Sequence, residues 1–280
     1  MRKISSEKIR ETVSALCIEA NISLRRDILD AIKRALAREK KRIAKDILRE
    51  LIENAAIAKR EKLPICQDTG AAIVYCEIGQ NVLITGDDLA RSINRGVSDG
   101  YRKGYLRKSI VESPLDRKNT GTNTPAVIHT TIVPGDKIKI SVCPKGFGSE
   151  NKSKIRMFNP TASIKEIKEF ILDVVKECGP EACPPLVLGI GLGGTFEKSA
   201  ELAKAALLRA INRKNPDKDL DRLEKELLGD INALNIGPMG MGGKTTALGV
   251  NILTFPTHIA GLPVAVCVSC HATRGSEKTI

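Results

Sequence analysis

The sequence predicts an α+β fold in which an N-terminal helical segment precedes mixed strands and helices. Apolar residues recur every three or four positions from Ser5 to about Arg60, which is the period of amphipathic helices. Beyond Gly70, strand-like and helix-like segments follow one another without a repeat or a low-complexity linker. We therefore expect one domain over residues 1–280, with residues 1–60 as a helical segment packed on it.

The expected elements follow from the spacing of apolar residues along the chain. The first sixty residues should form three helices, because the pattern that Ile9, Val13 and Leu16 begin is repeated twice. A hairpin is expected around Pro134-Gly135-Asp136, which separates two alternating segments. The predicted strands are 71–78, 126–133, 137–142, 186–190, 246–253 and 263–268, and the predicted helices are 86–102, 164–177, 196–211 and 220–228.

The composition is that of an ordinary globular protein. A chain of 280 residues with 42% hydrophobic residues can bury a sizeable core. No apolar run approaches the roughly 20 residues that span a bilayer, and the charged N-terminus lacks the pattern of a secretory signal. We therefore expect a cytoplasmic protein with reduced cysteines and no membrane partner.

The net charge of +12 raises the question of nucleic-acid binding. The excess of Lys and Arg is concentrated in helical stretches such as 34–45, where it alternates with apolar residues as on a solvated helix face. Trp is absent and aromatic residues make up 3% of the chain, so bases would find little to stack on. We expect no nucleic-acid partner.

Three glycine-rich segments, 145–153, 189–194 and 237–243, lie between predicted elements. Such loops let the backbone approach a ligand and present N–H groups to an anion. Residues 189–194 have the spacing of a dinucleotide fingerprint, but the second parallel strand that such a fold requires does not follow. Residues 238–245 imitate a phosphate loop, with Pro238 in place of its first glycine.

The most telling stretch is 63–70, in which Cys66 lies two residues from Asp68 at a turn. Cys183 precedes a double proline, and Cys270 lies in a Cys-Val-Ser-Cys-His segment. Three separated thiolates can hold an iron–sulfur cluster that ordinarily takes four, which leaves one iron open to a substrate. We expect the other cysteines to be small buried residues; they are Cys17, Cys76, Cys143, Cys178 and Cys267.

Other interpretations of these residues stay open on the sequence alone. The segment 267–271 has the spacing of haem attachment but no export signal, and a zinc site there would lack a second close pair of cysteines. Asp68 suits a tight Asp-Thr-Gly turn without any chemistry. His129 and His258 could be core histidines, and Arg107 could be one more surface cation.

Taken together, six segments resemble the class I, iron–sulfur-dependent fumarate hydratase and L-tartrate dehydratase family, in its alpha subunit or N-terminal domain. They occur in the family's order and cover most of the chain. The segments are Cys66-Gln67-Asp68-Thr69-Gly70, Asn119 to Pro125, Lys145 to Lys152, Ala182-Cys183-Pro184-Pro185, Gly237 to Thr246, and Ser269-Cys270-His271-Ala272-Thr273-Arg274.

The resemblance implies a [4Fe–4S] cluster held by Cys66, Cys183 and Cys270, with an open iron that acts as a Lewis acid toward malate. It also implies that Asp68 is an acid/base group. Four residues are implied to contact the substrate: Gln67, Arg107 as a carboxylate clamp, Gly148 through its backbone, and His258. In single-chain relatives a second domain follows, so this chain, which stops at Ile280, is expected to need a separate beta subunit in a hetero-oligomer.

The hypothesis is therefore the alpha subunit of a hydro-lyase that acts on a small dicarboxylate, with fumarate and malate preferred. L-Tartrate dehydration to oxaloacetate is the alternative, because malate and tartrate each carry two carboxylates and lose a hydroxyl beside one of them. A hypothesis of another class is a non-catalytic metal-binding or nucleic-acid-binding protein on the same scaffold.

Overall fold

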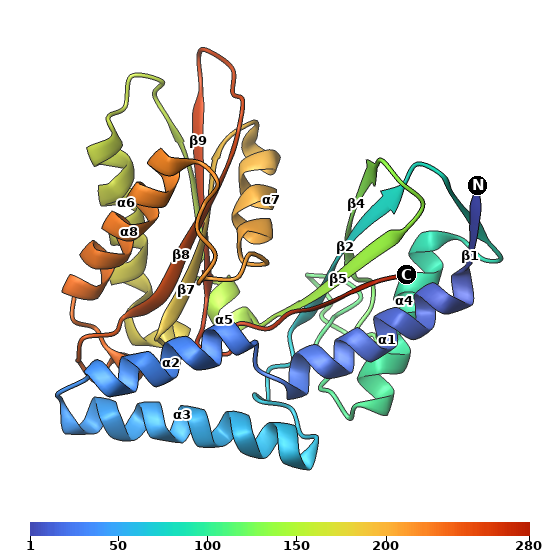
Figure 1. Ribbon diagram of the computed structural model, residues 1–280, viewed down its shortest axis with the longest axis horizontal. Coiled ribbons are helices and arrows are strands. Elements are labelled where there is room, and N and C mark those ends of the chain that lie inside the picture. Colours follow the sequence, from blue (N-terminus) through green and yellow to red (C-terminus); the bar gives the residue numbers. More distant parts are fainter. The chain divides into compact units, whose positions relative to one another are not determined.

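The computed structural model describes all residues from 1 to 280, in which helices are mixed with β-sheets (Figure 1). The predicted α+β class is confirmed. The chain divides into a first unit, residues 1–25, 54–147 and 274–280, and a second unit, residues 26–53 and 148–273. The N-terminal helical segment is shared between the two units, and the single-domain organisation stays a prediction. No helix has the length and apolar character that crossing a membrane requires.

The first unit pairs two helices with a four-stranded sheet of order β10-β5-β2-β4. Its elements are β1 (Arg2–Ser5), α1 (Ser6–Ile22), β2 (Ala71–Gly79), β3 (Val82–Thr85), α4 (Leu89–Lys103), β4 (Val127–Val133), β5 (Ile138–Lys145) and β10 (Ser276–Thr279). Helices α1 and α4 pack closely because α4 carries Gly96 and Gly100 at the contact. A Cβ atom at these positions would lie 2.6 Å from the Arg10 carbonyl oxygen and 2.8 Å from that of Ser14.

The hairpin prediction around Pro134-Gly135-Asp136 is wrong. Strands β4 and β5 exist, but β2 lies between them, parallel to β4 and antiparallel to β5. The end of β2 separates the two strands, since the Gly79 N–H donates to the Lys137 carbonyl at 2.8 Å and the Gln80 N–H donates to the Val133 carbonyl at 2.7 Å. A central strand that is apolar on both faces therefore overrides the local turn signal.

The second unit contains a four-stranded sheet of order β6-β9-β7-β8, in which only β7 and β8 are parallel. Its elements are α2 (Arg26–Arg38), β6 (Lys154–Phe158), α6 (Ile164–Cys178), the 3₁₀ helix η1 (Gly179–Ala182), β7 (Leu186–Gly193), α7 (Phe196–Ala206), α8 (Lys218–Ala233), η2 (Pro238–Gly240), β8 (Ala247–Phe255) and β9 (Leu262–Ser269). Helices α3 (Arg42–Glu61) and α5 (Phe147–Glu150) run across the unit boundaries. The three predicted N-terminal helices are thus α1, α2 and α3.

The glycines of segment 189–194 have a packing role rather than a nucleotide-binding one. Gly189 and Gly191 lie within strand β7, where α7 covers them. A Cβ atom on either would lie 2.0 Å from an α7 carbonyl oxygen, that of Ala203 or Ser199. Only glycine lets the helix approach the sheet this closely, which explains the motif without a dinucleotide.

Several boundaries differ from the prediction for identifiable reasons. Helix α7 ends at Ala206, five residues before the predicted end, because the buried Asn251 side chain donates to the carbonyls of Ala206 and Arg209 at 3.0 and 2.8 Å. Strands β1, β3, β6 and β10 were not predicted. Each has only four or five residues, too few to establish an alternation.

Candidate active site

The turn at residues 66–70 holds Asp68 by both carboxylate oxygens. Oδ1 accepts the Gly70 N–H at 3.0 Å, and Oδ2 accepts the Phe147 N–H at 2.7 Å. Gly70 has a φ of +73°, and a Cβ there would lie 2.6 Å from the Lys145 carbonyl carbon, so glycine is required. Asp68 therefore forms the turn that the sequence leaves open as an alternative, and it stays half-buried at the surface of the first unit.

A buried polar network fixes the backbone of this turn. Arg274, 3% exposed, donates from Nη1 to the Asp68 carbonyl at 2.7 Å and to Asn21 Oδ1 at 2.9 Å. The Tyr101 hydroxyl lies 2.8 and 2.9 Å from the carbonyl oxygens of Thr69 and Gly70. Burial raises the pKa of Tyr101 above its ordinary value, so the hydroxyl stays a donor at any physiological pH.

The same network brings Arg107 to the turn. The Thr69 hydroxyl donates to the Arg107 carbonyl at 2.8 Å, and Asn123 connects Ser109 with Gly70 through bonds of 2.7 and 3.1 Å. The Arg107 side chain is exposed and has no carboxylate partner in the chain. Gln67 is also exposed, with its Oε1 3.5 Å from Cys66 Sγ. The first unit thus gathers four candidate residues: Cys66, Gln67, Asp68 and Arg107.

The second unit gathers the other two candidate cluster ligands. Cys183 follows η1 in a left-handed conformation with φ +53° and is exposed. Its carbonyl accepts the His271 N–H at 3.4 Å and lies 3.1 Å from His271 Nδ1. Cys270, the neighbour of His271, is anchored by the Thr273 hydroxyl, which donates to its carbonyl at 2.8 Å. A strained non-glycine backbone of this kind is typical of functional sites.

Two candidate substrate residues, His258 and Gly148, form no hydrogen bond with Cys183 or Cys270. His258 is exposed in the loop before β9, where its Nδ1 accepts the Ala260 N–H at 3.1 Å. Cys270 follows the other end of β9, and a strand of eight residues spans roughly 25 Å. Gly148 is exposed in α5 with open space where a Cβ would be. The roles of His258 and Gly148 in substrate binding stay predictions.

Exposure divides the eight cysteines into two groups. Five are buried, and these are the five that were predicted to be small core residues. Burial raises the pKa of the Cys17 thiol to about 12 and those of Cys76 and Cys178 to about 11, so these three remain protonated at neutral pH. Thiolates are the metal ligands, which makes the buried thiols poor donors. The three that are not fully buried are Cys66, Cys183 and Cys270.

Comparisons with known proteins identify the family of the chain. Residues 10–279 match the fumarate hydratase (Fumerase) family. The chain is 41% identical over 281 residues to the putative L(+)-tartrate dehydratase subunit alpha of Methanocaldococcus jannaschii, covering 98% of each chain. It is 28% identical over 271 residues to the L(+)-tartrate dehydratase subunit alpha of Escherichia coli K12, covering 95% of this chain and 89% of that protein.

These matches place the chain among the hydro-lyases, an enzyme class, and decide against the non-catalytic alternative. The chain belongs to the fumarate hydratase family, so the resemblance seen in its motifs is confirmed.

Several residues that build the site had no predicted role. Arg274 and Asn123 lie inside the six segments that resemble the family. Tyr101 and Asn21 lie in helices whose sequences have an ordinary amphipathic pattern. The position of Arg274 three residues after the Cys270-His271 pair is the one signal that could have pointed to it.

Proposed function

We propose that this chain is the alpha subunit of a [4Fe–4S]-dependent hydro-lyase that interconverts fumarate and malate. The observation that carries the proposal is the exposure of its cysteines. The three that the family resemblance assigns to a cluster, Cys66, Cys183 and Cys270, are the three that the fold leaves accessible. A cluster needs thiolates that it can reach, and the other five cysteines are buried.

The donor set suits an iron–sulfur cluster better than zinc. Three thiolates leave a cluster one protein ligand short, whereas structural zinc takes four protein ligands and the catalytic zinc sites with three include histidine. When bound by Cys66, Cys183 and Cys270, the cluster would supply a Lewis acid for the hydroxyl that is lost.

The residues of the chain would bind the substrate and move a proton. The Arg107 guanidinium is exposed and unpaired, and its planar fork suits a bidentate contact with one substrate carboxylate. Asp68 is the acid/base candidate. Its two backbone hydrogen bonds fix the direction of the carboxylate, and each oxygen keeps a second lone pair for a proton. Gln67 is exposed beside Cys66 for a further substrate contact.

A separate beta subunit would complete the site. Both relatives described above are named as alpha subunits. The substrate has two carboxylates, and the candidate residues of this chain include one arginine clamp. We therefore propose a hetero-oligomer in which the partner binds the second carboxylate and supplies the remaining proton-transfer group. We propose a cytoplasmic location, because none of the eight cysteines is paired in a disulfide.

Dehydration of L-tartrate is the second candidate, and the names of both relatives described above favour it. Malate and tartrate present the same two carboxylates and the same leaving hydroxyl. They differ by one further hydroxyl, which a site with a matching hydrogen-bond partner can distinguish strongly.

The test is anaerobic copurification of the chain with its partner, followed by turnover measurements on malate, fumarate and L-tartrate. We expect a brown complex that hydrates fumarate and loses iron when Cys66, Cys183 or Cys270 is changed to Ser. Cys267→Ser is the matched control, because Cys267 is buried three residues from Cys270 and should leave the iron content unchanged. Turnover of tartrate alone would select the second candidate, and zinc without iron would overturn the cluster.

A further inference from the structure

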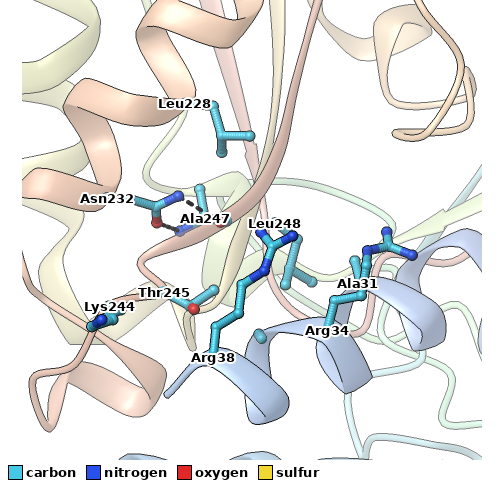
Figure 2. A pocket seen from close by; sticks show the side chains of 10 residues that line it. Ala31, Arg34, Arg38, Leu228, Asn232, Lys244, Thr245, Ala247 and Leu248 are labelled. Atoms are coloured by element: carbon cyan, nitrogen blue, oxygen red, sulfur yellow. Dashed lines mark hydrogen bonds between the residues drawn. The ribbon is translucent and has the colours of Figure 1, made fainter. Parts of the chain in front are cut away.

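A cavity of about 470 Å³ in the second unit has no role in the proposed reaction (Figure 2). It opens between helix α2, helix α8 and the segment that leads into β8. Its lining residues are Ala31, Arg34, Ala35, Arg38, Leu228, Asn232, Lys244, Thr245, Ala247 and Leu248. The volume lies within the range of small-molecule sites, about 300–1,000 Å³.

The charges around this cavity are all positive. Arg34, Arg38 and Lys244 are exposed, no carboxylate lines the cavity, and none of the three cations forms an ion pair in the chain. In the same stretch of chain, Arg26 lies 3.7 Å from Asp30 and Arg42 lies 3.9 Å from Asp46, whereas Lys33, Lys40 and Lys41 also form no ion pair. Arg34 and Arg38 are four residues apart on one helix face, where like charges repel and destabilise the helix. A bound anion would remove this repulsion.

The floor of the cavity is apolar, and small side chains create its space. Ala31 and Ala35 of α2 are each 7% exposed, where larger residues would fill the gap against β8. The polar group of Asn232 is already used: Oδ1 accepts the N–H groups of Thr246 and Ala247 at 2.7 and 2.9 Å. Its amide NH₂ group donates to the Ala247 carbonyl at 3.3 Å, and Figure 2 shows the two bonds between Asn232 and Ala247. The groups left for a ligand are therefore the three cations and the Thr245 hydroxyl.

A buried carboxylate connects the two segments that carry the basic rim of the cavity, which consists of Arg34, Arg38 and Lys244. Glu39, 3% exposed, accepts the N–H groups of Lys40 and Lys41 at 2.8 and 3.0 Å and that of Lys244 at 2.7 Å. Burial acts to raise the pKa of Glu39, but these three bonds outweigh it and hold the pKa below its ordinary value. The carboxylate thus stays ionised and joins the end of α2 to the segment that carries Lys244.

The rim does not work as a phosphate loop, although residues 238–245 imitate one. Its amide groups are already occupied, because the Gly242 N–H donates to the Ile236 carbonyl at 2.7 Å and the Gly243 N–H donates to Asn235 Oδ1 at 3.2 Å. An anion here would therefore be bound by side chains rather than by a backbone nest.

We propose that this cavity binds a phosphate monoester with a small apolar body. Three cations around one opening match the charge of about −1.5 to −2 that a phosphate monoester carries at neutral pH. Arginine forks suit phosphate oxygens, and the alanine and leucine floor suits an uncharged apolar group. The site goes beyond the hydro-lyase function and does not depend on it.

The test measures binding to the full-length chain by calorimetry, with phenyl phosphate, inorganic phosphate and phthalate as probes. We expect one phenyl phosphate per chain, bound more tightly than the other two. Loss of two charge-assisted contacts in Arg34→Gln/Arg38→Gln should weaken this binding by roughly tenfold or more. The control is Lys33→Gln, which removes one charge from the same helix outside the cavity and should change affinity by less than about twofold.

A second variant tests the apolar floor of the cavity separately from its three cations. Ala35→Leu should fill the floor and weaken phenyl phosphate while leaving inorganic phosphate unchanged. If Lys33→Gln weakened phenyl phosphate binding as much as the double arginine variant, the effect would be one of general surface charge and the proposed site would be wrong. Tighter binding of phthalate would overturn the phosphate assignment, and absence of saturable binding would overturn the proposal. None of these measurements uses the cluster or turnover, so they test the cavity proposal independently of the hydro-lyase proposal.

Discussion

Replacing Asp68 by Asn tests its observed role in the turn and its proposed role as an acid/base group. In the native turn both carboxylate oxygens accept a backbone N–H, from Gly70 at 3.0 Å and from Phe147 at 2.7 Å. An amide has one oxygen and one NH₂ group, so in either orientation one backbone donor would face another donor. The cost of one lost bond with an unsatisfied donor is about 1–3 kcal/mol in the free energy of unfolding.

This loss corresponds to a fall of roughly 2–10 °C in Tm for a chain of this size. The loss of acid/base function should lower turnover by roughly a hundredfold or more. The cluster spectrum should remain, because no thiolate is changed. The assays are thermal unfolding, iron content and turnover of the copurified complex, the last measured well below the Tm of the variant.

Asp116→Asn is the matched control, since Asp116 is exposed in the same unit and its carboxylate has no hydrogen-bond partner. We expect it to leave Tm, iron and turnover unchanged. Normal turnover by Asp68→Asn with a reduced Tm would leave Asp68 only its role in the turn. An unchanged Tm would refute the hydrogen-bond argument itself.

Three further predictions use other residues of the chain. Arg107→Lys should raise KM roughly tenfold without changing Tm, because an exposed ammonium cannot reproduce two parallel hydrogen bonds; an unchanged KM would remove Arg107 as the clamp. A thiol reagent applied to the cluster-free native chain should label Cys66, Cys183 and Cys270 rapidly and the five buried cysteines only after unfolding, which mass spectrometry can follow. The lowered pKa of Glu39 stabilises the fold above the ordinary pKa of a glutamate, and this contribution is lost as the pH falls through the lower folded value. Glu39→Gln should therefore reduce the urea midpoint at neutral pH and converge with the wild type in acid; a constant difference would contradict the linkage.

Local pattern was sufficient for most elements of the fold but not for their pairing. Helices α1 to α3 and strand β2 follow from periodicity, because each buries one face or a continuous apolar run. The predicted hairpin around Gly135 is wrong because a local turn signal says nothing about β2, a third strand that ends at Gly79 far upstream and pairs with both β4 and β5. Gly189 and Gly191 show the same limit, since the helix that covers them determines their role.

The candidate site was predictable as residue types and not as an assembly. Cysteines beside a carboxylate and a double proline stand out in the sequence because such neighbours are chemically unusual. The residues that place them do not stand out, since Asn21 and Tyr101 each lie in a helix whose pattern is explained by packing alone. Their function arises from contacts across 31 to 253 positions of sequence, which periodicity cannot indicate.

These supporting contacts share a chemical feature: they are made to main-chain carbonyls and not to the reactive side chains of the same residues. Arg274 binds the carbonyl of Asp68, Thr69 that of Arg107, His271 that of Cys183, and Thr273 that of Cys270. A carbonyl accepts such bonds without changing the charge or nucleophilicity of its own side chain, so the loops can be rigid while the thiols and the guanidinium stay available to a ligand. Asp68 is the exception, because its carboxylate also forms the turn. Substitution of Asp68, the residue proposed to move a proton, should therefore lower both stability and turnover. Substitution of Arg107 or of the three cysteines should lower activity without lowering stability.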